Sequence, residues 1–221
     1  MCGRFTLLAD ELKIRERFGL SNTIDNYHPS YNIAPGQNVL AIIFDGREKR
    51  AGFLRWGLVP SWAKDEKIGY KMINARSETA HVKPSFKNLM TRKRCLVIAD
   101  SFYEWQQTEE GKIPKRIHLK SNELFTFAGL WDKWEHDEKK VFTCTLLTKD
   151  ANEYMEQFHH RMPIILPREQ EDDWIKHSFQ TAKDAQQFLQ TVGTESFTAY
   201  SVSTYVNNAR NNDAICIEPV V

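Results

Sequence analysis

The feature that most limits the possible folds is a long succession of short, strand-like runs with little helical sequence between them. These runs are rich in Val, Ile, Phe and Thr, which favour β-strands. Because they do not alternate regularly with helices, the pattern predicts an α+β fold on a strongly curved, mainly antiparallel sheet rather than a doubly wound parallel sheet. We predict strands at residues 38–44, 48–57, 71–74, 94–100, 101–107, 115–119, 124–131, 140–148, 162–166, 197–202 and 214–220.

Short helices and turns should connect these strands. Residues 8–18 place apolar side chains among charges at roughly helical spacing and end at Gly19, a residue that commonly stops helices. Residues 171–179 and 182–190 predict two further short helices. Residues 26–37 should form an ordered loop, and Asp45-Gly46 predicts a hairpin turn. With neither a linker nor an internal repeat, we expect a single domain over residues 1–221.

Composition excludes several classes of protein. The 221 residues are 41% hydrophobic, which is enough to build a packed core, and 30 basic against 29 acidic residues leave a net charge of only +1. Any basic binding site must therefore be local. The sequence has no apolar run as long as a membrane span and no signal-peptide h-region, so we expect a cytoplasmic monomer that does not bind membranes.

The four cysteines are too far apart to form a zinc motif, so we predict neither a metal site nor a cofactor. Cys95 and Cys144 lie within apolar, strand-like runs and should be buried free thiols. The stretch from Lys83 to Arg94 contains five basic and no acidic residues. A solvated surface face is the ordinary interpretation of such a patch, and contact with phosphate groups is the alternative.

Cys2 differs from the other cysteines because an initiator Met is usually removed before a small residue. The chain would then begin with a primary amine and a thiol on adjacent carbons. With ordinary pKa values of about 7.7–8.0 and about 8.5, both groups are partly nucleophilic near neutral pH. Such an aminothiol converts an aldehyde first into an imine and then into a five-membered thiazolidine. Taken alone, most residues after an initiator Met have no catalytic role.

Three other segments contain residues suited to catalysis, each with an ordinary structural alternative. Glu104 lies among aromatic residues, which could raise its pKa, but it could also be an exposed strand residue. His159 and His160 could supply an acid/base group or belong to a loop. Asn74 and Arg76 could orient a substrate and hold a phosphate, or lie in a turn.

Several motifs, taken together, resemble the SRAP family, the SOS response-associated peptidases, which includes abasic-site-shielding proteins of bacteria and animals. The motifs occur in family order along essentially the whole chain. They are MCGRF at the start, YNIAPGQ at 31–37, RWGLVPSWA from Arg55, INARSET at 73–79, SFYEW from Ser101, HHRMPIIL at 159–166 and VSTYVNNARNNDAICIEPV at 202–220.

The resemblance implies a curved β fold with a site around the C1′ of an abasic nucleotide in single-stranded DNA. Matched motif by motif, its catalytic residues are Cys2, Asn74, Glu104 and His159. The H-x-R-x-P pattern selects His159 rather than His160. The positions expected to contact DNA are Arg4, Asn32, Pro35, Trp62, Arg76 and Arg161, with core packing an equal alternative for Trp62.

The function implied is shielding of abasic sites by a covalent thiazolidine crosslink through Cys2, as part of the DNA-damage (SOS) response. A failed ring closure would add weak lyase activity. The alternatives are a peptidase, including autoproteolytic removal of Met1, and a non-covalent reader of damaged DNA. When bound to DNA, the protein would be associated with the nucleoid.

Overall fold

The computed structural model describes residues 2–176, 178–193 and 195–220. Its strands are β1 (Phe5–Leu7), β2 (Ser30–Ile33), β3 (Asn38–Phe44), β4 (Lys49–Trp56), β5 (Asn74–Arg76), β6 (Arg94–Ala99), β7 (Ser101–Thr108), β8 (Gly111–Leu119), β9 (Phe125–His136), β10 (Lys139–Asp150), β11 (Arg161–Pro163), β12 (Ile165–Leu166) and β13 (Phe197–Ser201). Its helices are α1 (Glu11–Phe18), η1 (Glu66–Lys71), α2 (Ser77–Ala80), α3 (Lys87–Arg92), α4 (Glu153–Glu156), α5 (Arg168–Lys176), α6 (Ala182–Thr191), η2 (Thr204–Asn207) and η3 (Ala214–Ile217).

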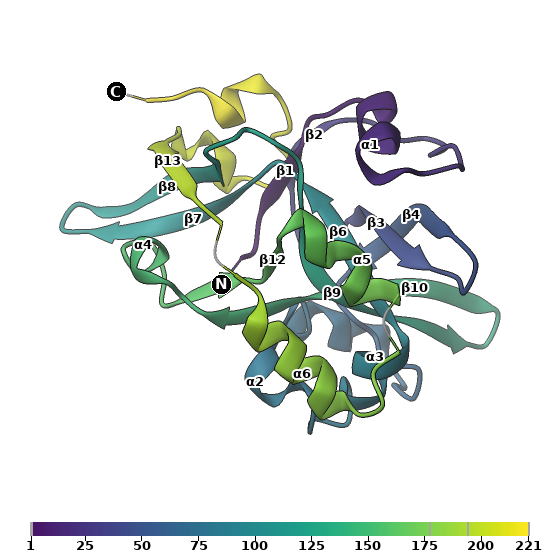
Figure 1. The fold of residues 1–221 in the computed structure, drawn as a ribbon. Coiled ribbons are helices and arrows are strands. Elements are labelled where there is room, and N and C mark those ends of the chain that lie inside the picture. Colours follow the sequence, from purple (N-terminus) through teal and green to yellow (C-terminus); the bar gives the residue numbers. More distant parts are fainter. Residues whose placement is uncertain (1, 177, 194, 221) are drawn as a thin grey trace.

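The larger sheet closes on itself as a barrel. Strand β3 pairs with β4 and β6, β6 pairs with β9, and β9 pairs with β10, all antiparallel. The closing contact is a short parallel pairing in which Thr143 and Cys144 of β10 face Arg55 and Trp56 of β4. Strands β5 and β11 extend the far end of β10, and β12 pairs with β9. Figure 1 shows the strong curvature of this sheet.

A second sheet has the strand order β13-β8-β7-β1-β2. Its strand β1 lies against the barrel, because the ring of Phe5 packs 5.2 Å from Trp56 and 5.5 Å from Phe127, measured between ring centroids. Phe102 of β7 reaches the same cluster and makes an edge contact with Phe127. The two sheets therefore share one apolar core, and the chain enters this core almost at its first residue.

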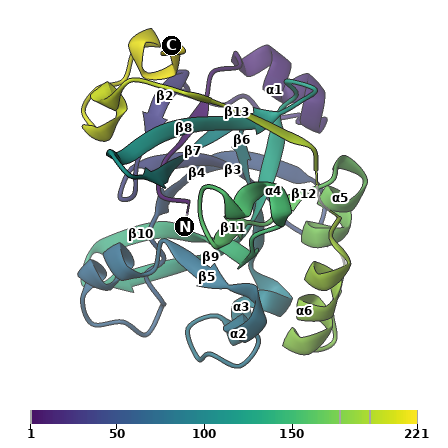
Figure 2. The same ribbon diagram turned by 90° about the vertical axis from the view of Figure 1, so that its left-hand side faces the viewer.

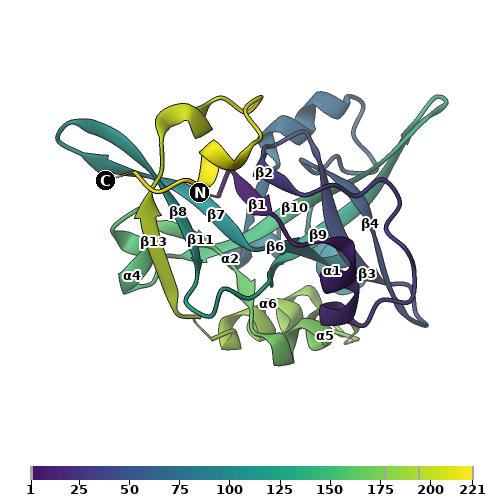
Figure 3. The same ribbon diagram turned by 90° about the horizontal axis from the view of Figure 1, so that it is seen from above.

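The helices lie around the barrel rather than between its strands. Helix α1 begins after Asp10, whose side chain accepts from the backbone N–H of Lys13, and it ends at Gly19 with φ 61°. Helix α6 begins with a capping box between Thr181 and Asp184. Figure 2 shows α2, α3 and α6 grouped below the sheets, and Figure 3 shows the β7–β8 and β9–β10 hairpins projecting in opposite directions.

The predicted fold class is confirmed, including the curved and mainly antiparallel sheet. Most predicted strands are present, and the predicted turn at Asp45-Gly46 connects β3 to β4. The helix predicted at 171–179 begins earlier, at Arg168, and its predicted residue 177 lies outside the described residues.

Three of the predicted elements are wrong. Residues 214–217 form the 3₁₀ helix η3, capped by Asp213, instead of a strand, and only Pro219 makes a β-bridge, to Val202. The predicted loop 26–37 contains β2, since β1 offers it a pairing partner. The strand predicted at 71–74 begins only at Asn74, because η1 extends to Lys71 and Met72 caps its end.

Over the described residues, none of the helices has the length and apolar character needed to cross a bilayer.

Candidate active site

The site forms where the start of β1 meets β5 and β7. Within the antiparallel β1–β7 pair, Phe5 faces Phe102 and Thr6 faces Ser101, and the backbone N–H of Tyr103 donates to the carbonyl of Arg4. Cys2, three residues before β1, lies close enough to Glu104 of β7 for the charge of that carboxyl to act on its thiol. From the barrel side, the side-chain amide of Asn74 donates to the backbone carbonyl of Cys2 at 2.8 Å. Three of the predicted catalytic residues are thus brought together by three separate parts of the chain.

The Cys2 side chain is fully buried, with its Sγ 3.8 Å from the carbonyl oxygen of Arg4. Burial raises the pKa of the Cys2 thiol well above its usual range, and the nearby charge of Glu104 raises it further. This sulfur is therefore a thiol rather than a thiolate at neutral pH. Attack by the sulfur as the first step of a reaction is therefore disfavoured. The Cys2 thiol is better suited to a later step in which its proton passes to another group.

Glu104 is only 4% exposed, although it belongs to a strand whose later residues are solvated. Burial raises the pKa of its carboxyl group, so the protonated form persists to higher pH than in an exposed glutamate. The interpretation of Glu104 as an exposed strand residue is wrong. A carboxyl group with a raised pKa is the type that can both donate and accept a proton near neutrality.

His159 lies between α4 and β11, and its Nδ1 accepts from the backbone N–H of Arg161 at 2.9 Å. Its ring stacks on that of His160 at 4.2 Å between centroids. Burial, together with the charge of His160, lowers the pKa of His159 to about 4. At neutral pH the imidazole is therefore neutral, and since Nδ1 accepts, its proton is on Nε2, which can donate to a substrate oxygen. Among the described residues, the hydrogen bond and the ring contact of His159 are thus with its two sequence neighbours rather than with Cys2, Asn74 or Glu104.

Arg161 is buried and surrounded by acceptors. Its guanidinium makes two parallel bonds to Glu78 at 2.9 Å, a third bond to Asp150 and another to the carbonyl of Thr148. These bonds join α2, β10 and β11, the elements next to Asn74 and His159. Neither Glu78 nor Asp150 could be identified from sequence as a partner of Arg161. The residues around them, ARSET and TKDAN, form no pattern that indicates a bond to a distant arginine.

Half-buried Arg4 and buried Asn32 form a second polar group. The Arg4 guanidinium donates to Asn32 Oδ1 at 2.7 Å and to the carbonyl of Val206 at 2.8 Å, and it lies over the ring of Trp105. The amide of Asn32, 1% exposed, donates to the carbonyls of Val206, Asn208 and Asn211. This arrangement fixes the C-terminal segment against β1 and β2.

The remaining predicted DNA contacts are more accessible. Arg76 is exposed at the end of β5 and makes no salt bridge with any described residue. Trp62 is 61% exposed, so the alternative of core packing is wrong for this side chain. Pro35 is half-buried and precedes Gly36, whose backbone N–H donates to the carbonyl of Trp56.

The basic patch predicted from Lys83 to Arg94 is only partly a surface. Arg94 is buried, donating to the carbonyls of Trp174 and Met90, and Lys93 pairs with Asp132 at 2.7 Å. Lys83, Lys87 and Arg92 remain exposed. Cys95 and Cys144 are fully buried in the barrel, as predicted. The described residues contain no group of three or more His, Cys, Asp or Glu side chains placed to hold a metal ion.

Comparison with a family model matches residues 1–209 to "SOS response associated peptidase (SRAP)". The chain is 50% identical to the abasic site processing protein YoqW of Bacillus subtilis, with 99% of each chain covered. It is 34% identical to the abasic site processing protein HMCES of Gallus gallus, covering 88% of this chain and 67% of that protein.

Among solved structures, a crystal structure of a protein from Bacteroides thetaiotaomicron matches over 100% of both chains, with a TM-score of 0.88 and 25% identity. A protein from Bordetella bronchiseptica matches 91% of this chain with a TM-score of 0.78 and 26% identity. The barrel with its second sheet is thus an architecture found in other bacterial proteins.

Proposed function

Because the chain belongs to the SOS response associated peptidase (SRAP) family, we propose that it processes abasic sites in single-stranded DNA by forming a covalent bond through Cys2. Its relatives YoqW and HMCES are named abasic site processing proteins. The observation that carries the proposal is the placement of Cys2, whose carbonyl is held by Asn74 while its side chain lies beside the buried carboxyl of Glu104.

The reaction begins once Met1 has been removed and the amine of Cys2 is free. The amine nitrogen attacks C1′ of the open-chain abasic aldehyde, and loss of one water molecule gives an imine. The high pKa of the Cys2 thiol supports this order, because an amine with an ordinary pKa of about 7.7–8.0 is the better nucleophile at neutral pH. Protonated Glu104 supplies the proton that the departing hydroxyl group needs.

The second step closes the ring. Sγ bonds to the imine carbon, the C=N bond becomes a single bond, and the thiol proton passes to the nitrogen, with Glu104 as the carrier. Ring closure protects the DNA strand, since an open imine acidifies the C2′ hydrogens and promotes β-elimination. A small fraction of elimination would appear as lyase activity.

Asn74 and His159 orient the reactants. One N–H of the Asn74 amide is used on the Cys2 carbonyl, and its buried Oδ1 has no hydrogen-bond partner among the described residues, so it can accept from the Cys2 amine or a sugar hydroxyl. The Nε2–H of neutral His159 can donate to the oxygen that develops negative charge as the sugar ring opens.

The DNA strand would be held by Arg76 and by stacking on Trp62, the two most exposed of the predicted contacts. Arg4 and Arg161 are already bonded to protein acceptors, so we assign them to positioning β1 and β11 unless DNA displaces those acceptors. With a net charge of +1, affinity for undamaged DNA should be modest and strongly dependent on salt.

The test uses purified protein and an abasic single-stranded oligonucleotide, followed by denaturing electrophoresis. We expect wild-type protein to give an adduct that survives denaturation and the Cys2→Ala variant to give none. Equal adduct from both proteins would refute the role of Cys2. A complex that forms but is lost on denaturation would indicate the alternative, a non-covalent reader of damaged DNA.

A Glu104→Gln variant separates binding from chemistry. It should bind the oligonucleotide as wild type does but form the adduct more slowly, by roughly 10²–10⁴-fold, because the proton carrier is lost. An unchanged rate would remove Glu104 from the mechanism.

A further inference from the structure

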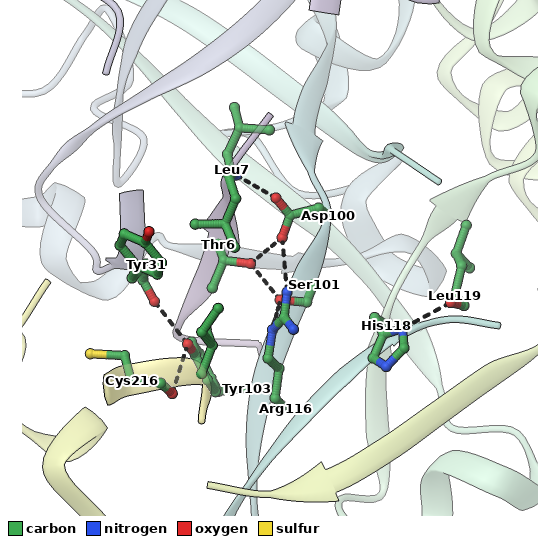
Figure 4. Close-up of polar contacts among 12 residues, drawn as sticks. Thr6, Leu7, Tyr31, Asp100, Ser101, Tyr103, Arg116, His118, Leu119 and Cys216 are labelled. Carbon is green, nitrogen blue, oxygen red and sulfur yellow. Dashed lines mark hydrogen bonds and ion pairs between the residues drawn. The ribbon is translucent and has the colours of Figure 1, made fainter. Parts of the chain in front are cut away.

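A polar cluster lies where the end of β1 meets the start of β7 in the second sheet (Figure 4). It consists of Thr6, Leu8, Asp100, Ser101 and Arg116, and we call it the Asp100 cluster. One carboxylate oxygen of Asp100 accepts from the Thr6 hydroxyl, and the other accepts from the backbone N–H of Leu8. The Thr6 hydroxyl also meets the Ser101 hydroxyl, which accepts from Arg116 Nε at 2.8 Å. Arg116 Nη2 lies 3.5 Å from Asp100.

The Asp100 cluster contacts β1 at the end of its short pairing with β7. β1 has only three residues and pairs with β7 through Phe5–Phe102 and Thr6–Ser101. On its other side the pairing with β2 shifts between Phe5 and Leu7, so that strand does not impose a regular register. Asp100 adds both side-chain and backbone bonds to β1, and its own N–H donates to the Thr6 carbonyl at 3.0 Å.

The register in turn decides what reaches Glu104. A slip of β1 by one residue would move Cys2 by about 3.3 Å along β7. Its amine and thiol would then be displaced from the Glu104 carboxyl and the Asn74 amide that lie beside Cys2. Asp100 accepts from the Thr6 hydroxyl within β1 and from the Leu8 N–H directly after β1, so the same slip would break both of these bonds.

We propose that Asp100 is a positioning residue for the reaction of Cys2, acting through Thr6 and Leu8 to fix the register of β1 against β7. This inference rests on the proposed function. Arg116 extends the same restraint to the C-terminal segment, because its Nη1 donates to the Tyr200 hydroxyl at 2.7 Å and Tyr200 donates to the carbonyl of Ile217 at 2.8 Å.

The test replaces Asp100 with Asn. An amide has one acceptor oxygen where the carboxylate has two, so either Thr6 or Leu8 loses its acceptor and faces an N–H₂ group. The matched control is Glu171→Gln. Glu171 is also a buried carboxylate bonded to a threonine hydroxyl, Thr126, and to an arginine, Arg17, but it lies on α5.

Three quantities are measured for wild type, Asp100→Asn and Glu171→Gln: the dissociation constant for an abasic oligonucleotide, the adduct rate constant at saturating DNA, and the ratio of adduct to cleaved strand. We expect Asp100→Asn to slow adduct formation roughly 10- to 100-fold with little change in affinity, as expected for misplaced reacting groups. The cleaved fraction should rise, because a displaced thiol closes the ring more slowly. Glu171→Gln should change neither the rate constant of adduct formation nor the cleaved fraction.

Equal rates and equal product ratios for Asp100→Asn and wild type would overturn the inference, as would the same loss in Glu171→Gln, which would indicate general destabilisation. If Asp100→Asn does not fold, Thr6→Val removes the two bonds of the Thr6 hydroxyl, to Asp100 and Ser101, at nearly constant shape and is judged by the same criteria. Absence of adduct with wild-type protein would instead refute the proposed function itself.

Discussion

The close approach of Gly57 and Gly69 provides a quantitative test of the structure near Asn74. A Cβ atom on Gly57 would lie 2.7 Å from the carbonyl oxygen of Gly69, closer than real Cβ contacts, and Gly57 has φ 128°. The strained dihedral costs about 1–3 kcal/mol for a residue other than glycine. Relief of the clash against backbone costs about 1–3 kcal/mol more.

The two costs sum to about 2–6 kcal/mol, and about 0.4–1 kcal/mol is returned through the unfolded chain, so we expect Gly57→Ala to lower the free energy of unfolding by about 3–4 kcal/mol at the middle of this range. For a chain of this size that corresponds to a fall in Tm of roughly 5–15 °C. The substitution should also slow adduct formation. Neighbouring bonds join this segment to the site, since Leu58 N–H donates to the Met72 carbonyl and Trp56 Nε1 to the Ile73 carbonyl, one residue before Asn74.

The control is Gly52→Ala, in the same region of the chain, where an added Cβ meets nothing within 4 Å. It should leave the protein as stable as wild type or stabilise it by up to about 1 kcal/mol. Thermal and urea unfolding followed by circular dichroism measure both variants. Equal stability of Gly57→Ala and Gly52→Ala would refute the close approach between the two backbones.

Three further predictions concern Glu104, His159 and Trp62. Glu104→Gln should stabilise the protein at neutral pH, because burial raises the pKa of this carboxyl in the folded state. The gain should shrink as pH falls through the raised folded-state pKa and be nearly gone below about 4.3, where the unfolded state is also protonated; a gain that grows with acid would contradict the assignment. In an NMR titration the ring of His159 should remain neutral down to a pKa of about 4. The His160→Gln variant should raise the pKa of His159, because it removes a positive neighbour. An ordinary pKa near 6.5 in both proteins would exclude the stacked, desolvated arrangement. Trp62→Ala should leave Tm unchanged, because the side chain is 61% exposed. The substitution should weaken binding of single-stranded DNA by about 1–3 kcal/mol, which fluorescence anisotropy measures. A fall in Tm at unchanged affinity would assign Trp62 to the core instead.

Most strands could be predicted from sequence because their signals are local, and the candidate catalytic residues could be proposed only because several short motifs occur together in family order. Continuous apolar runs mark β3 and β6, aromatic residues mark β7, and short motifs contain Asn74, Glu104 and His159. Closure of the barrel could not be predicted in the same way. It depends on the pairing of Thr143 and Cys144 with Arg55 and Trp56, residues far apart in the chain, and no local pattern specifies that contact.

The errors have the same physical origin. Residues 214–217 are apolar enough for a strand, but Asp213 caps a 3₁₀ turn there and no long neighbour is available for pairing. Arg94 and Arg161 have the sequence character of surface charges, yet both are buried by partners contributed from distant elements. Burial of a charge is decided by tertiary contacts, which the residues next to it in sequence do not reveal.

The most direct test of the central claim is intact mass spectrometry of the product formed with an abasic oligonucleotide. The account predicts a species with the mass of the protein lacking Met1 plus the oligonucleotide minus one water molecule, unchanged by borohydride because the thiazolidine contains no C=N bond. An adduct that still contains Met1, that maps to a residue other than Cys2, or that gains two hydrogens on reduction would contradict it.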